Sequence, residues 1–169
     1  MVLAAGCTGP GSSRSIDLVS ELRRAERRAA RPVDEAVRAD VVTVGAGPEP
    51  AVITETPARV IYQVRMPARA SFHARVALMP DESGRPHGAA VRVGISDDRF
   101  YDELAKVPLT SAAGAAPQWQ SVEVDLGGYS GWQWSVFYRP SQITWKLILN
   151  ADATPGGTIA WIAPVIAPK

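Results

Sequence analysis

Residues 59–79 read RVIYQVRMPARASFHARVALM, and this stretch decides the class of fold. Apolar residues occupy every second position on both sides of the Met66-Pro67 corner. Alternation with a period of two is typical of a β-strand that buries one face and exposes the other. We therefore predict strands over Arg59–Met66 and Ala70–Met79. The side chains predicted to face the core are Val60, Tyr62, Val64 and Met66 in the first strand and Phe72, Ala74, Val76 and Leu78 in the second.

The same alternation recurs on both sides of this stretch. Turn-forming sequences such as Gly45-Ala46-Gly47-Pro48 separate the segments. Because no strand–helix–strand rhythm is present, we exclude a parallel sheet and predict an all-β fold, an antiparallel β-sandwich. The further predicted strands are Ala39–Val44, Ala51–Thr54, Ala89–Ser96, Trp119–Leu126, Ser135–Tyr138, Thr144–Asn150 and Thr158–Ile166, with a short helical turn and an edge segment in Phe100–Leu109.

One short helix is predicted before the first strand, over residues 17–30. Asp17 is a favourable N-cap, apolar residues follow at helical spacing, and Pro32 ends the helix. The chain then divides into a flexible tether, residues 1–14, and one sandwich domain with its leading helix, residues 15–169. The other helix face is basic, and it either touches anionic lipid or is an ordinary solvated surface. Its basic residues are Arg23, Arg24, Arg27 and Arg28, and Arg31 follows just beyond the helix.

Composition excludes several classes of protein. The 169 residues carry a net charge near +1, whereas a nucleic-acid-binding domain needs a strongly basic face, so we predict no nucleic-acid partner. A single cysteine excludes an internal disulfide and a cysteine-based zinc site. No run of apolar residues reaches the 18 or so that a membrane span requires.

Four short motifs follow one another in a familiar order. They are Val64–Ala70 (VRMPARA), Val91–Asp97 (VRVGISD), Val122–Gly131 (VEVDLGGYSG) and Trp161–Ile166 (WIAPVI). This order, behind an amphipathic helix, resembles galactose-binding-like jelly-roll domains over residues 15–166. It resembles in particular the sandwich that precedes the catalytic domain of some bacterial sulfatases and related glycan-processing enzymes. The resemblance implies a jelly-roll fold and an accessory role.

The closing motif departs from the family at one position. Such domains frequently carry an acidic residue between the closing tryptophan and proline, where it can bind a structural calcium ion. This chain has Ala163 there, so we expect neither a metal site nor another cofactor. Trp161 is expected in the core, where the last strand crosses it.

The N-terminus resembles a bacterial lipoprotein lipobox. The only cysteine, Cys7, ends Leu3-Ala4-Ala5-Gly6-Cys7 and is followed by a Gly/Ser/Pro tether. A lipidated Cys7 would anchor the domain to a membrane outside the cytoplasm, in the periplasm or on the cell surface. Only six residues precede Cys7, and a secretory signal needs a charged region and about 7–15 apolar residues. The interpretation therefore requires a start further upstream; otherwise the match is chance.

The sequence contains no convincing catalytic constellation. It has no G-x-S-x-G nucleophile motif and no sulfatase C/S-x-P-x-R motif. Of the two histidines, His73 is predicted on the solvent face of its strand and His87 in a Pro-His-Gly loop. Neither has a neighbour that suggests a base or a ligand. We therefore predict no catalytic residues and expect that the chain is not an enzyme.

The segment Trp132–Arg139 is the best candidate for a binding site. Aromatic faces stack on the apolar faces of sugar rings, and an arginine beside them can hydrogen-bond hydroxyls, carboxylates or sulfates. The alternative is that these aromatics pack in the core, as Trp145 is expected to do. The candidate ligand-binding residues are Trp132, Trp134, Tyr138 and Arg139.

These observations leave two functions open. The first is a non-catalytic, lipid-anchored β-sandwich that binds carbohydrate or docks to a partner hydrolase. The second is the accessory N-terminal segment of a sulfatase-like hydrolase, with a purely structural role. A glycan or a partner enzyme is therefore the expected partner, together with the membrane through the lipid.

Overall fold

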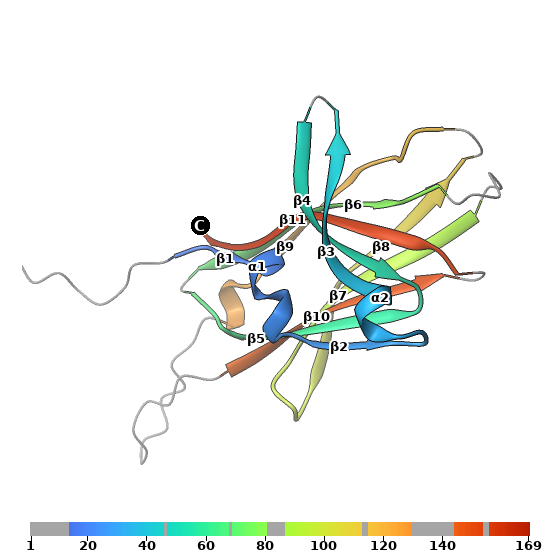
Figure 1. The fold of residues 1–169 in the computed structure, drawn as a ribbon. Coiled ribbons are helices and arrows are strands. Elements are labelled where there is room, and N and C mark those ends of the chain that lie inside the picture. The colour runs from blue at the N-terminus through green and yellow to red at the C-terminus, as the bar shows by residue number, and fades with distance from the viewer. Residues whose placement is uncertain are drawn as a thin grey trace, which may run out of the picture.

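The computed structural model describes residues 14–45, 47–67, 69–80, 87–112, 115–129, 144–153 and 156–169. Two antiparallel sheets pack face to face, which confirms the predicted β-sandwich (Figure 1). Each sheet turns one set of alternating side chains toward the other sheet, as the period-two pattern predicts.

The first sheet has six strands. Its order is β3–β4–β11–β6–β9, and β1 pairs with β11 outside this path. The strands are β1 (Ile16–Asp17), β3 (Val37–Val44), β4 (Gly47–Glu55), β6 (Ala70–Leu78), β9 (Gln120–Asp125) and β11 (Thr158–Pro168).

The second sheet has five strands in the order β2–β5–β10–β7–β8. They are β2 (Glu26–Ala29), β5 (Ala58–Arg65), β7 (His87–Ser96), β8 (Tyr101–Ser111) and β10 (Thr144–Ala153). The helical pieces are α1 (Leu18–Glu21), the 3-10 turn η1 (Leu22–Arg24), α2 (Val33–Ala36) and the 3-10 turn η2 (Gly127–Tyr129).

The core between the sheets contains the side chains that alternation assigned to it. Trp161 of β11 is fully buried, and its indole N–H donates to Thr54 Oγ1 of β4 at 3.2 Å. Trp145 of β10 is buried as well. A buried indole needs a partner for its single donor, and Thr54 supplies it.

The leading helix is shorter than predicted. Asp17 caps it as expected, since its carboxylate accepts the N–H groups of Val19 at 2.9 Å and Ser20 at 3.4 Å. The helical conformation ends at Ala25, whose backbone is extended, and residues 26–29 form β2 instead. The prediction of helix over residues 17–30 is therefore wrong beyond Arg24. The edge of β5 offers unpaired backbone groups, and pairing with them outweighs local helix propensity.

The basic residues of this region are mostly paired with carboxylates. The pairs are Arg24–Glu21, Arg27–Asp34, Arg28–Glu26 and Arg31–Glu55. This pairing favours the solvated charged surface over the lipid-binding face.

Two further expectations need correction. Residues 101–111 form one continuous strand at the edge of the five-stranded sheet, so the edge segment is confirmed and the short helical turn is not. His87 is the first residue of β7 rather than part of a loop. No helix within the described ranges is long and apolar enough to cross a bilayer.

Candidate carbohydrate-binding surface

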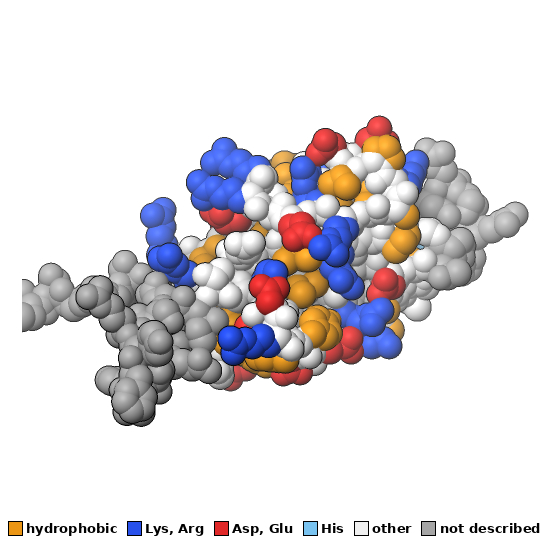
Figure 2. All heavy atoms as spheres, turned by 90° about the horizontal axis from the view of Figure 1, so that it is seen from below, with side chains coloured by type: hydrophobic (Ala, Val, Ile, Leu, Met, Phe, Trp, Pro, Cys, Tyr) orange, Lys and Arg blue, Asp and Glu red, His pale blue; other side chains and the backbone are white. Residues whose placement is uncertain are grey.

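The outer face of the five-stranded sheet carries a row of basic and amide side chains. Register places one residue of each strand in this row: Arg28 of β2, Arg59 of β5, Asn150 of β10, Arg92 of β7 and Lys106 of β8. Directly opposed residues of an antiparallel sheet point to the same face. Figure 2 shows the molecule from this side, with hydrophobic side chains lying among Lys, Arg, Asp and Glu.

Tyr101 lies on this face, at the start of the edge strand β8. It is 49% exposed, which makes it one of the few large hydrophobic side chains at the described surface. Its position depends on Gly94 of β7, because a Cβ atom there would overlap the Cε2, Cζ and hydroxyl atoms of Tyr101. A register shift between Val93 and Gly94 accompanies this close approach. Glycine in a strand interior often marks such a site.

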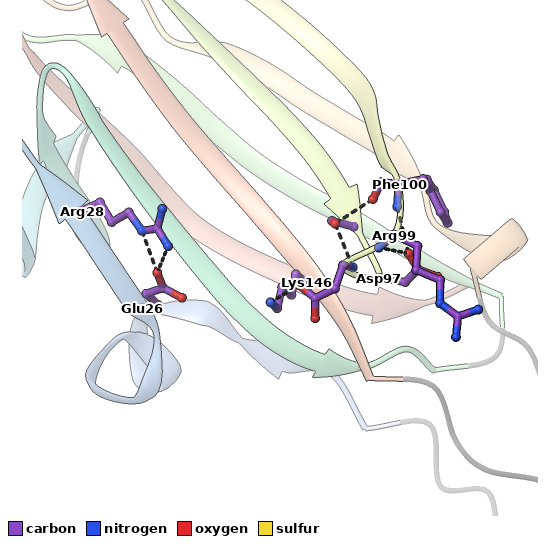
Figure 3. A network of polar contacts seen from close by, with 8 residues as sticks. Glu26, Arg28, Asp97, Arg99, Phe100 and Lys146 are labelled. Carbon is purple, nitrogen blue, oxygen red and sulfur yellow. Dashed lines mark hydrogen bonds and ion pairs between the residues drawn. The ribbon is translucent and has the colours of Figure 1, made fainter.

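The turn between β7 and β8 fixes the backbone next to Tyr101 (Figure 3). Asp97 Oδ1 accepts the N–H groups of Arg99 at 2.9 Å and Phe100 at 3.1 Å, and Ser96 Oγ donates to the carbonyl of Phe100 at 2.7 Å. The N–H of Arg99 is the main cause that lowers the pKa of Asp97. An ion pair from Lys146 of β10 to Asp98 ties the turn to the sheet. Tyr101 therefore follows directly after a turn whose backbone is held by hydrogen bonds.

Polar groups surround the Tyr101 hydroxyl. Burial against the sheet raises the pKa of Tyr101 and Glu103 adds to the increase, whereas Arg92, Arg59 and the Asn150 side chain oppose it. Asn150 in turn accepts a hydrogen bond from Arg59 Nε at 2.6 Å. We call Tyr101, Gly94, Arg59, Arg92 and Asn150 the Tyr101 platform.

Carboxylates hold Arg92 within the platform. Its Nε lies 3.2 Å from Asp152 Oδ2, and one terminal nitrogen lies 3.7 Å from Glu103 Oε2. The hydrogen bond to Asp152 is the main cause that raises the pKa of Arg92. Both carboxylates are thereby engaged with the same guanidinium.

The platform combines an exposed aromatic ring with fixed N–H donors. Such a surface can stack against the apolar face of a sugar ring and donate hydrogen bonds to its oxygens. Two isoleucines beside it, Ile61 and Ile148, lie in register with Gly94 and provide an apolar floor.

A second group of aromatics lies at the end of the sandwich next to Tyr101. Trp145 makes edge-to-face contacts with Phe100, at 5.8 Å between ring centroids, and with Tyr129, at 5.1 Å. The Tyr129 hydroxyl donates to Asp102 Oδ2 at 2.6 Å. Burial, followed by this hydrogen bond, raises the pKa of Tyr129 to about 12.

The candidate residues of the sequence analysis lie outside the described residues. This applies to Trp132, Trp134, Tyr138 and Arg139, and to Cys7. The described chain stops at Tyr129, which contacts Trp145, and resumes at Thr144, the residue before Trp145.

His73 is hydrogen-bonded to a serine rather than to a carboxylate within the described residues. His73 is half-buried on the outer face of β6, and its Nε2 lies 2.7 Å from Ser71 Oγ. Ser71 is buried, and within the described ranges no carboxylate is hydrogen-bonded to His73 to orient it as a base. Among the described residues, no group of three or more His, Cys, Asp or Glu side chains could hold a metal ion.

The sequence pattern alone did not indicate that the residues of the Tyr101 platform lie together. Gly94 inside an alternating strand was the available signal, because it marks a place where another group approaches the backbone. Which side chain approaches depends on the register shift between β7 and β8, and local sequence does not encode that shift.

The sequence matches no protein-family profile and no curated protein, but the fold has clear structural relatives. The domains CBM51-1 and CBM51-2 with the M60 catalytic domain of Clostridium perfringens ZmpB match at a TM-score of 0.58 and 11% identity, covering 92% of this chain and 15% of that one. The TmCBM61 complex with β-1,4-galactotriose matches at 0.52 and 12% identity, covering 88% and 90%. The CBM51 of Clostridium perfringens GH95 with methyl-galactose matches at 0.52 and 12% identity, covering 91% and 100%.

This chain has the fold of these carbohydrate-binding modules. The likeness confirms the galactose-binding-like jelly roll expected from the order of the four motifs. It spans nearly the whole of two isolated modules, but only a small part of the ZmpB chain.

Proposed function

We propose that this chain is a non-catalytic carbohydrate-binding module that holds glycan on the Tyr101 platform. The observation that carries the proposal is the half-exposed Tyr101 ring on the outer face of the sheet, seated over Gly94. Asn150, by a hydrogen bond, and the two arginines of the platform, by their charge, act on the Tyr101 hydroxyl and oppose the rise of its pKa. An exposed aromatic with fixed hydrogen-bond donors is a common way to bind a sugar.

The structural relatives support this proposal. TmCBM61 was solved with β-1,4-galactotriose and the GH95 module with methyl-galactose. Those ligands belong to those proteins, and identities of 12% do not transfer a site. The relatives favour glycan binding as the role, and the Tyr101 platform is the location that we propose for it in this chain.

The aromatic segment predicted from the sequence is proposed to extend the same site. Its flanking residues Tyr129 and Thr144 belong to the end of the sandwich at which Tyr101 begins β8. Phe100, next to Tyr101 in sequence, contacts Trp145, which follows the segment. We propose that Trp132, Trp134, Tyr138 and Arg139 contact the parts of a glycan that project beyond the sheet.

We also propose that the module acts outside the cytoplasm, anchored through a lipid on Cys7, and that it can dock to a partner hydrolase. The alternative is an accessory segment of a sulfatase-like hydrolase with only a structural role. The ZmpB match favours keeping this alternative, because there the same fold accompanies a catalytic domain in one chain.

Replacement of Tyr101 separates these functions. Wild type, Tyr101→Ala and Tyr101→Phe are compared on a broad glycan array, with hits measured by calorimetry. We expect Tyr101→Ala to weaken binding at least tenfold with unchanged thermal stability, and Tyr101→Phe to keep most of it because the ring remains. Equal binding by Tyr101→Ala would place the site elsewhere. If the wild-type protein binds no glycan, the purely structural role is the function that remains.

A further inference from the structure

The basic row across the five-stranded sheet is unevenly neutralised. Arg28 pairs with Glu26, and Arg92 pairs with Asp152 and Glu103. Arg59, between them in the row, has no carboxylate partner within the described part of the chain. Among the three guanidinium groups of the row, Arg59 is therefore the one whose positive charge is not compensated by an ion pair within the described residues.

Arg59 is nevertheless held in place. Its Nε donates to Asn150 Oδ1 at 2.6 Å, and the Asn150 side chain is itself buried. This bond leaves the two terminal nitrogens of the guanidinium as donors. A fixed guanidinium presents them in the geometry that binds two oxygens of one carboxylate or sulfate.

The acceptors beside the two arginines, by contrast, already face a guanidinium group. Asn150 Oδ1 accepts from Arg59, and the carboxylates of Asp152 and Glu103 face Arg92. A neutral sugar hydroxyl both donates and accepts, whereas an anionic group only accepts. Within the described residues, the terminal nitrogens of Arg59 are therefore donors without a carboxylate acceptor, and they suit an anionic group of a ligand.

We propose that the platform recognises an acidic glycan, with one sugar ring on Tyr101 and a carboxylate or sulfate of the glycan on the terminal nitrogens of Arg59. This inference rests on the proposed function and narrows its ligand class. Arg59 binds the anion, Asn150 orients Arg59, and Tyr101 receives the ring.

A matched glycan panel tests the inference. It contains uronic-acid, sialylated and sulfated oligosaccharides, each beside its neutral counterpart. We expect the acidic members to bind at least tenfold more tightly, with an affinity that falls as NaCl rises from 50 to 200 mM. Comparison of the affinities for the uronic-acid and the sulfated oligosaccharides shows which anionic group the protein prefers.

Substitution of Arg59 links this preference to one side chain. Arg59→Gln should weaken acidic-glycan binding by about tenfold to hundredfold, as the loss of a hydrogen bond to a charged group predicts. Arg59→Lys should be intermediate, because an ammonium group lacks the two-pronged geometry. Arg23→Gln is the matched control: Arg23 is exposed in η1, outside the five-stranded sheet, and should bind as wild type.

The outcomes separate the two levels of the proposal. Binding of neutral glycans that depends on Tyr101 but not on Arg59 would overturn the acidic-ligand inference and leave the proposed function standing. A folded protein that binds no member of the panel would overturn both. Melting curves of all variants exclude unfolding as the cause of lost binding.

Discussion

Tyr101 occupies the space that a side chain at position 94 would fill. Three atoms of its side chain lie within overlap distance of a Cβ on Gly94, although the two residues belong to different strands. The glycine therefore seats the tyrosine on the outer face of the sheet. Residue 94 therefore acts on the platform through the position of the Tyr101 ring.

Gly94→Ala is expected to abolish glycan binding while preserving the fold. The new methyl group would push the partly exposed Tyr101 side chain away from the sheet, which costs little because the tyrosine can swing into solvent. Binding should fall as far as in Tyr101→Ala. Calorimetric titration with the best array hit measures this loss.

Gly88→Ala is the control for this change. Gly88 lies in the same strand, and a Cβ there would meet only the carbonyl of Leu109 at 3.7 Å, an ordinary contact. This variant should bind like wild type. Equal losses of glycan affinity in both variants would mean that the substitutions disturb strand β7 as a whole and not the contact between residue 94 and Tyr101.

Trp161→Ala should destabilise the sandwich by about 3–5 kcal/mol, as truncation of a buried aromatic does. Trp161 is fully buried, and its removal also leaves Thr54 Oγ1 without the indole donor. Urea unfolding followed by circular dichroism measures the free energy of unfolding. Phe100→Ala, at a residue 45% exposed, should cost much less. Similar midpoints for both variants would contradict this assignment of the core.

Tyr129 should make the fold sensitive to alkali. Its pKa is raised from 10.0 to about 12 in the folded protein, so the unfolded chain loses the phenolic proton first as the pH rises. The stabilisation is complete below about pH 10 and is lost between pH 10 and 12. Tyr129→Phe should therefore flatten the decline of unfolding free energy over this range. A decline as steep as that of wild type would contradict the role of Tyr129.

Cys7 is predicted to carry the lipid anchor. Expressed in a bacterial host with a lipoprotein signal peptide placed ahead of the lipobox, the protein should partition into the detergent phase, and Cys7→Ser should move it to the aqueous phase. One acyl chain gives only marginal membrane binding, so firm partitioning also indicates several chains or an added basic patch. Wild-type protein found in the aqueous phase would refute the lipobox interpretation.

The aromatic segment is tested by single alanine changes at Trp132, Trp134 and Arg139. If the segment extends the glycan site, each change should weaken binding several-fold and shift the melting temperature little, since exposed side chains contribute little to stability. Core packing of the tryptophans predicts the opposite pattern, with large losses of stability and no specific effect on binding.

Strand positions and the faces of the sandwich were predictable from sequence because burial enforces a strict period of two. The predicted strands 59–66 and 70–79 agree with β5 and β6 to within one residue at every boundary. The strand at residues 26–29 was not predictable, since the spacing of Leu22, Ala25 and Ala29 suits a helix and only the free edge of β5 makes this segment a strand. Local sequence does not report which edges remain unpaired.

The site was harder to predict than the fold for a similar reason. An aromatic-rich segment such as Trp132–Arg139 attracts attention in a sequence, whereas Tyr101 is a single tyrosine at a strand start. Its significance depends on Gly94 and Asn150, which come from two other strands. Only the register of β8, β7 and β10 brings these residues together.

Titration of the ¹⁵N-labelled protein with its best glycan hit, followed by amide chemical shifts, locates the glycan site on the fold. We predict that the largest shifts cluster on the five-stranded sheet, around Gly94, Tyr101 and Asn150, and that Tyr101→Ala abolishes them at the same glycan concentration. Shifts confined to the six-stranded sheet, or shifts unchanged in Tyr101→Ala, would contradict the assignment of glycan binding to the Tyr101 platform.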